Sequence, residues 1–162
     1  MTRPNDFDFD KALKEVLDVI DIGPHCSCAD ITMELLRVNL PLPWPQSRYS
    51  AAGFGGGVGG SGGPCGAFCA GIIALSLYAG REEPPGCVAE PVEAASQRFY
   101  DDWLLNQGSF LCSELTGYPS LRDEHVRNEF FSSGGEEICF NKRIRFAVEK
   151  VLELAATLPT SE

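Results

Sequence analysis

Residues 51–80 read AAGFGGGVGGSGGPCGAFCAGIIALSLYAG, a glycine-rich stretch that continues directly into an almost wholly apolar one. Ten of the first twenty-one residues are glycine, and Cys65 and Cys69 follow, four residues apart. Pro64 suits the first turn of a helix and Gly80 suits its end, so residues 65–80 are predicted to form a helix. A helix that is apolar on every side is typical of the buried centre of a bundle.

Four further segments are predicted to be helical and to pack around this central helix. Apolar residues recur in them at spacings of three and four, and Gly-Pro or proline-rich stretches follow the first two. No two segments alternate in the manner of paired strands, so the predicted class is all-α. We expect a single domain over residues 1–162, with a peripheral N-terminal helix (residues 1–24), in a compact bundle of about five helices. The four further helices are predicted over about residues 7–22, 28–40, 91–106 and 138–158, and residues 108–135 are expected to form short turns and a polar loop.

The composition is that of a soluble globular protein with an acidic balance. The chain has 162 residues, with 13 Lys and Arg against 23 Asp and Glu, which gives a formal net charge of −10. This charge disfavours nucleic acid and anionic membranes as partners, because both require cationic patches. No apolar run is long enough to span a bilayer, and the first ten residues lack a signal-peptide core. We therefore expect a cytoplasmic protein without membrane insertion.

The chain contains seven cysteines, more than ordinary core packing readily explains. In a reducing compartment such a number favours metal binding or redox chemistry over a structural disulfide framework. The number is also odd, so complete pairing within one chain is impossible.

The glycine run contains two short patterns with known chemistry, and both are interpreted as chance matches. Residues 57–62 fit G-x-G-x-x-G and residues 59–63 fit G-x-S-x-G, but no strand precedes either pattern. The run also lacks the lysine of a phosphate-binding loop. Its glycines are instead expected to let the backbone approach the residues around Cys65.

Cys65 is predicted to lie at the N-terminal end of the central helix. Free N–H groups and the helix dipole at that position stabilise negative charge, so they should lower the pKa of the thiol. Cys69 lies one turn deeper on the same helix face. A thiolate in this position can bind a metal or attack a disulfide.

Four stretches of the chain resemble one protein family. They are HCSCADITMELL (25–36), FGGGVGGSGGPCGAFCAG (54–71), FLCSELTG (110–117) and ICFNKRIRFAVEKVLEL (138–154). Their content and order are similar to the redox-active family named for its C…CGAxxG…C…C cysteine pattern (C_GCAxxG_C_C). One departure is that Ala70 stands where the pattern ends in glycine, with Gly71 one residue later.

The resemblance implies a helical iron–sulfur fold, related to the domain that accompanies the haems of split-Soret cytochromes c. The haem part does not carry over, because the chain has no Cys-x-x-Cys-His attachment site. The cysteines of the pattern fall on Cys28, Cys65, Cys112 and Cys139, which become the expected metal ligands. Cys28, Cys65 and Cys139 are expected at helix starts. Close backbone approach is expected from Gly62, Gly63 and Gly66.

Three functions are compatible with these residues. The favoured one is an iron–sulfur protein that acts in electron transfer or redox sensing with a partner protein, as a possible homodimer. A thiol–disulfide oxidoreductase would use Cys65 with Cys69 or Cys28, and a zinc-stapled helical module would have no chemistry of its own. Cys26 and Cys69 have open roles, and Cys87 is interpreted as a bystander. His25 and His125 are expected at the surface.

Overall fold

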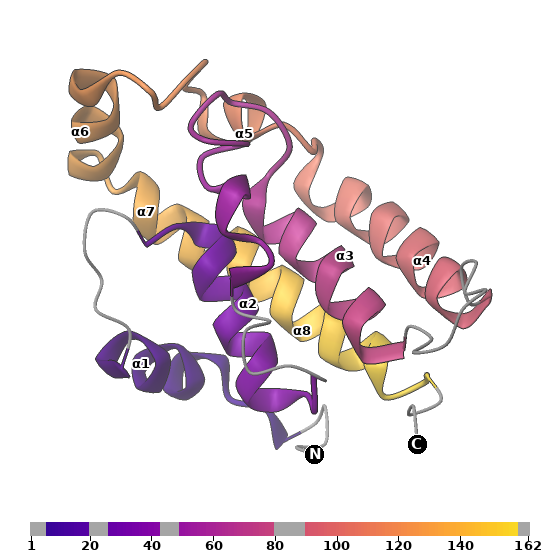
Figure 1. Cartoon of the computed structure of the whole chain (residues 1–162). Coiled ribbons are helices and arrows are strands. Elements are labelled where there is room, and N and C mark those ends of the chain that lie inside the picture. The colour runs from indigo at the N-terminus through magenta and orange to yellow at the C-terminus, as the bar shows by residue number, and fades with distance from the viewer. Residues whose placement is uncertain (1–5, 20–25, 43–48, 80–89, 159–162) are drawn as a thin grey trace.

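Helix α3 (Gly66–Ala79) lies between α2 (Cys28–Asn39), α4 (Glu90–Gln107) and α8 (Arg145–Ala155) in the computed structural model of the chain (Figure 1). The structure describes residues 6–19, 26–42, 49–79 and 90–158. Within these ranges there is no strand, and one isolated β-bridge joins Pro64 to Leu111. The remaining elements are α1 (Phe9–Val19), η3 (Ala52–Phe54), α5 (Cys112–Thr116), α6 (Glu124–Ser132), α7 (Gly135–Ile138) and η4 (Cys139–Ile144).

The predicted all-α class is confirmed, and the predicted long helices agree with the observed ones to within a few residues. The largest difference is at the C-terminal helix. It begins three residues earlier than predicted, as α7, and it passes through a π-helical segment, η4, before α8. Wider π turns inside α-helices are frequent at functional sites, and this one begins at Cys139.

The sequence prediction missed α5 and α6, which lie in the region expected to form turns. Helix α6 buries only one side chain, Phe130, so it has little of the apolar periodicity that predicts a helix. The start of α6 nevertheless has a clear local signal, the N-cap residue Asp123. The side chain of Asp123 accepts hydrogen bonds from the backbone N–H groups of His125 and Val126, at 2.9 and 3.1 Å.

Small residues allow α3 to lie close to its neighbours. Ala67, Ala70 and Ala74 are fully buried on it. A Cβ atom built at Gly71 would lie 2.7 Å from the ring of Phe99 on α4 and 3.2 Å from a methyl group of Val151 on α8. Gly71 is therefore required by the close approach of three helices.

An aromatic cluster joins α3, α4 and α8 beside this contact. Phe68 stacks on Phe99 at 5.4 Å between ring centroids, and Trp103 packs edge-on against Phe146. The indole N–H of Trp103, which is fully buried, donates to the carbonyl of Ser109 at 2.8 Å. These contacts make Trp103 a packing residue of the core.

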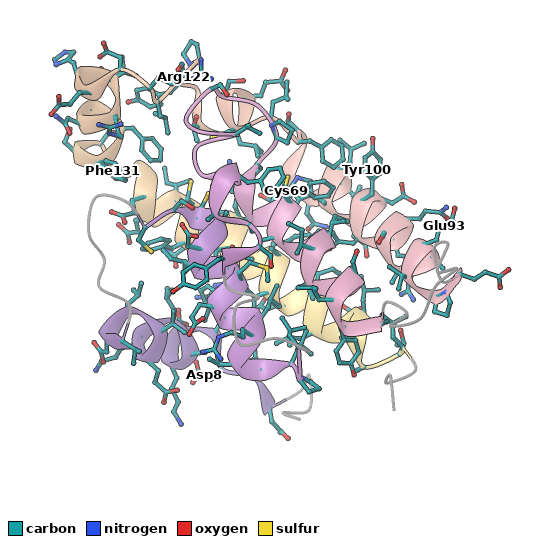
Figure 2. All side chains as sticks on the ribbon, viewed as in Figure 1. Asp8, Cys69, Glu93, Tyr100, Arg122 and Phe131 are labelled. Atoms are coloured by element: carbon teal, nitrogen blue, oxygen red, sulfur yellow. The ribbon has the colours of Figure 1, made fainter. Side chains whose placement is uncertain are left out.

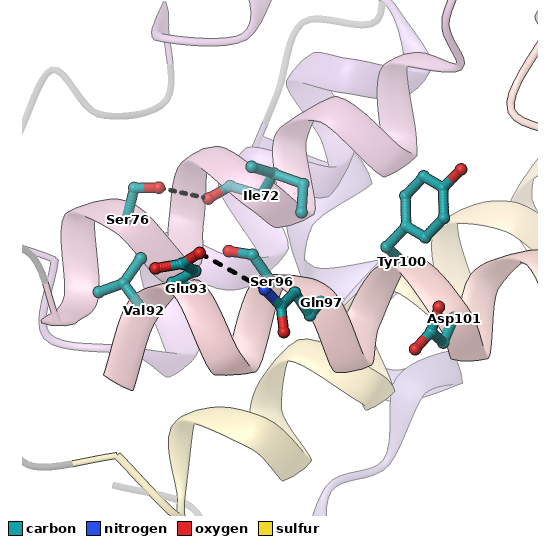
Figure 3. Close-up of a pocket in the computed structure, with 8 residues that line it drawn as sticks. All are labelled: Ile72, Ser76, Val92, Glu93, Ser96, Gln97, Tyr100 and Asp101. Carbon is teal, nitrogen blue, oxygen red and sulfur yellow. Dashed lines mark hydrogen bonds between the residues drawn. The ribbon is translucent and has the colours of Figure 1, made fainter. Parts of the chain in front are cut away.

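The outer side of α3 is less buried than a fully apolar helix predicts. Ile72 is half-buried and Ser76 is exposed, and both line a shallow surface groove of about 710 Å³ between α3 and α4 (Figure 3). The α4 side of the groove carries Glu93 and Asp101, and it contains no cysteine.

Helix α1 packs mainly against α2, at the edge of the bundle (Figure 1). It buries Phe9 and Val16. The guanidinium of Arg145 lies 4.3 Å from the ring centre of Phe9 and pairs with Asp10. In the part of the chain that the structure describes, no helix has the length and apolarity needed to cross a membrane.

Replacing Gly71 by alanine should lower the free energy of unfolding by about 1–2 kcal/mol, because overpacking at Phe99 outweighs the gain in helix propensity. Ser76→Ala on the exposed side of the same helix is the control and should change stability by less than about 0.5 kcal/mol. Urea unfolding monitored by circular dichroism measures both. A Gly71→Ala protein at least as stable as the unmodified chain would contradict the packing described.

Candidate metal centre

The start of α2 is fixed by a capping box, and this places Cys28 in its first turn. The N–H of Ser27 donates to the Asp30 carboxylate at 2.9 Å, and the Ser27 hydroxyl accepts from the N–H of Asp30 at 3.3 Å. Because both cap groups are satisfied locally, the helix begins at Cys28 as the sequence predicted.

Cys28 is half-buried, and its sulfur receives backbone N–H groups from three segments. These belong to Ala29 at the start of α2, to Gly66 and Ala67 at the start of α3, and to Gly56 in the glycine loop. A Cβ atom on Gly66 would lie 3.0 Å from this sulfur. The absence of a side chain at Gly66 therefore lets the backbone lie close to the sulfur of Cys28.

Cys65 immediately precedes α3, one residue before the helix itself begins. Its N–H donates to the carbonyl of Phe110 at 2.7 Å, and its sulfur accepts from the N–H groups of Ala67 and Phe68. The N-terminal end of α3 thus directs amides at two sulfurs, those of Cys28 and Cys65.

Cys112 is the first residue of α5, a helix start that the sequence prediction did not include. Two backbone hydrogen bonds hold it to the glycine loop: the N–H of Cys112 donates to the Gly63 carbonyl at 2.7 Å, and the N–H of Ser113 donates to the Gly62 carbonyl at 3.0 Å. Gly62 and Gly63 therefore hold the Cys112 segment beside Cys65. They do not line the cavity between the glycine loop and α2, which is lined by glycines earlier in the loop.

Gly57 and Gly62 occupy positions that exclude a side chain. Gly62 has φ of 75°, and a Cβ atom there would overlap the carbonyl oxygen of Pro119. Gly57 has φ of 73°, and its Cβ atom would lie 2.8 Å from that of Cys112. The glycine run is thus a folded loop with left-handed turns and close contacts.

Cys139 lies at the start of η4, within a continuous helical run, so it is not at a helix start as predicted. Arg143 follows on the same segment and donates from Nη2 to the carbonyl of Leu115 on α5, at 2.7 Å. Its positive charge lowers the pKa of both Cys112 and Cys139, so it lies near both thiols.

A cavity of about 430 Å³ lies between the glycine loop, the start of α2, α5, α6 and η4. Arg122 and Phe131, at the end of the molecule formed by the loop and α6, belong to its rim (Figure 2). Four thiols line this cavity, whereas Cys65 and Cys69 are not part of its lining. The four are those of Cys26, Cys28, Cys112 and Cys139.

All six cysteines that the structure describes are free thiols, and burial raises the pKa of each one above the ordinary value of 9.0. It raises the pKa of Cys112 to about 11 and that of Cys139 to about 12. The predicted low pKa of Cys65 is therefore wrong for the metal-free protein. Its helix amides do lower the pKa, but loss of solvent is the larger effect.

The thiols are also coupled to one another through Cys28. A charge on Cys28 raises the pKa of the five other described cysteines, which shows that they lie in one region: Cys26, Cys65, Cys69, Cys112 and Cys139. Within residues 6–19, 26–42, 49–79 and 90–158, no three His, Cys, Asp or Glu side chains lie close enough together to hold one metal ion. The four thiols of the cavity surround a shared space without converging on a point.

The other candidate residues have less defined places. Cys26 is half-buried at the cavity, and Cys69 is half-buried on α3, outside the cavity lining (Figure 2). His125 is exposed on α6, as predicted for a surface histidine. Cys87 and His25 lie outside the described residues.

Comparison with known proteins identifies the family. The model of the family described as "Putative redox-active protein (C_GCAxxG_C_C)" matches residues 26–154. The chain therefore belongs to this family, which confirms the resemblance seen in the sequence. No curated protein and no solved structure matches it.

Replacing Gly62 by alanine should destabilise the protein more than replacing Gly59. Both glycines have left-handed φ, 75° and 58°, so each alanine costs about 1–2 kcal/mol in backbone strain. Only at Gly62 does the new methyl group also overlap Pro119, since Gly59 has open space around it. Urea unfolding of the two variants measures the difference, and equal losses would show that the loop is not packed as described.

The metal-free protein should lose stability as pH rises above about 9. Unfolded thiols lose their protons near 9.0, whereas the folded Cys112 and Cys139 keep theirs to about 11 and 12. The unfolded state then binds fewer protons, so the free energy of unfolding falls with pH. In a Cys112→Ala/Cys139→Ala variant the decline measured by urea titration between pH 8 and 10.5 should be shallower. The same slope in both proteins would count against the burial of these thiols.

Proposed function

We propose that this protein binds an iron–sulfur cluster through Cys28, Cys65, Cys112 and Cys139 and acts in electron transfer or redox sensing. The observation that carries the proposal is the gathering of thiols from four separate segments around Cys28, at the amide-rich end of α3. The description of the family as redox-active supports the same function.

The donor set fits such a cluster. Thiolates are soft ligands that favour iron–sulfur clusters and zinc, and His125 is exposed on α6, away from the cavity lining. Each thiol must lose its proton to bind metal, and the buried thiolates then need compensating charge. The N–H groups of Gly66 and Ala67 supply part of that compensation, and a cationic metal centre supplies the rest.

The spacing of the thiols favours a cluster over a single zinc ion. A structural zinc holds four sulfurs at about 2.3 Å, so its ligands converge on one point. Here Cys28, Cys112 and Cys139 are distributed around a cavity of about 430 Å³. A centre with several metal atoms suits ligands that are spread in this way.

The cluster, when bound, would accept and release one electron, which requires no bond to the protein to form or break. The chain would hold the sulfurs in place and restrict water, and its contribution to the potential would come from hydrogen bonds and charge near them. The cavity is bordered by the exposed residues Arg122, Arg127 and Phe131, where a redox partner could approach. Electrons would pass from a reduced carrier protein to an oxidised one.

The thiol–disulfide alternative has less support. An attacking cysteine needs a thiolate near neutral pH, but Cys65 is buried with its pKa raised. Burial likewise raises the pKa of Cys69, to about 11. We also propose a cytoplasmic location, because a reducing compartment keeps thiols available for metal binding.

Protein purified without oxygen should be brown and contain iron and acid-labile sulfide in similar amounts, with little zinc. Cys65→Ser should lose most of the iron and the visible absorption, because serine is a poor ligand for soft metals. Cys87→Ser, which lies outside the four-cysteine pattern, is the matched control and should keep both.

Three measurements decide the outcome: the visible spectrum, iron and sulfide analysis, and zinc analysis. A colourless protein with one zinc per chain would refute the cluster and favour the structural zinc alternative. Equal iron in the Cys65→Ser and Cys87→Ser proteins would refute the ligand assignment while leaving the cluster in place.

A further inference from the structure

Arg143 carries a buried donor that the structure leaves without a partner. Its Nη2 donates to the carbonyl of Leu115, but its Nε is buried and makes no hydrogen bond in the described part of the chain. No ion pair between Arg143 and a carboxylate is found among the described residues either. A buried N–H group without an acceptor costs free energy, so an acceptor beside this Nε would stabilise the protein.

Two cysteine thiols lie near the Arg143 side chain. Cys139 lies four residues before Arg143, about one turn away on the same helical run. Cys112 begins α5, and the Arg143–Leu115 hydrogen bond anchors the guanidinium to that helix. The charge of Arg143 is felt at both thiols. The side chain therefore lies between two of the proposed ligands, with one donor free.

We propose that Arg143 donates its Nε–H to a sulfur of the bound cluster, either a ligand thiolate or an inorganic sulfide, and that its charge raises the reduction potential of the cluster. This inference rests on the proposed function. Arg143 is a positioning and tuning residue that binds no metal itself. The ligand it requires is an anionic sulfur centre.

The direction of the effect follows from charge. Reduction adds one electron, so the reduced centre is more negative than the oxidised one and is attracted more strongly to the guanidinium. A hydrogen bond to sulfur acts in the same direction, because it also stabilises the more electron-rich state. Removal of Arg143 should make the cluster harder to reduce.

Lys142 provides a matched control. It is the neighbouring residue on η4 and carries the same charge, but its side chain is exposed to water. Solvent and salt screen an exposed charge, so its removal should have little effect on a buried centre. Arg143→Gln and Lys142→Gln therefore change the net charge equally and differ only in position.

The experiment measures the midpoint reduction potential of the cluster in the anaerobically purified 162-residue chain, together with iron per chain and the circular dichroism spectrum. Arg143→Gln should keep the helical spectrum and show a lower potential than the unmodified protein. Lys142→Gln should show an unchanged potential. Arg143→Lys keeps the charge but lacks the guanidinium fork, so its potential should lie between those of the Arg143→Gln protein and the unmodified protein.

The outcomes separate this inference from the proposed function. Unmodified protein without iron or sulfide would refute the proposed function, and this inference with it. A loaded Arg143→Gln protein with an unchanged potential would overturn the inference alone. If Arg143→Gln fails to hold iron, the Arg143→Lys protein is the deciding variant. A reduction potential lower than that of the unmodified protein supports the inference, and an unchanged potential overturns it.

Discussion

Loss of solvent around a group of thiols is the constraint on which the rest of the structure depends. Cys28 lies half-buried against the first residues of α3, where the amides of Gly66 and Ala67 supply part of the polarity that water would otherwise give. Those amides are accessible to sulfur because Gly66 has no side chain and because α2 and α3 meet at their N-terminal ends. Burial keeps these thiols protonated, and the proposed metal centre would require them as thiolates.

The glycine loop connects this centre to the rest of the chain. Its carbonyl groups at Gly62 and Gly63 hold the segment that carries Cys112, while Gly56 donates its N–H to Cys28. The same loop therefore contacts two of the proposed ligands from different helices. Left-handed turns and contacts too close for a Cβ atom explain why glycine recurs in this loop. The loop is therefore a folded element with fixed contacts, and a flexible linker could not hold the two segments in place.

Much of the fold could be predicted from the sequence, because Pro64, Gly80 and the apolar run between them define the central helix with local signals. Helix α6 could not be predicted from periodicity, since it buries little beyond Phe130. At the site, the cysteine pattern indicated which thiols to consider, but desolvation depends on neighbours from distant segments, so the raised pKa of Cys65 was missed. The same holds for Arg143, whose place beside Cys112 depends on the packing of η4 against α5 through Leu115.

X-ray absorption at the iron edge tests most directly whether four cysteines of this chain hold an iron–sulfur cluster. The account predicts a first shell made of sulfur alone and a second signal from neighbouring iron atoms, both lost in a Cys28→Ser protein. A first shell of nitrogen or oxygen, or iron without an iron neighbour, would contradict it.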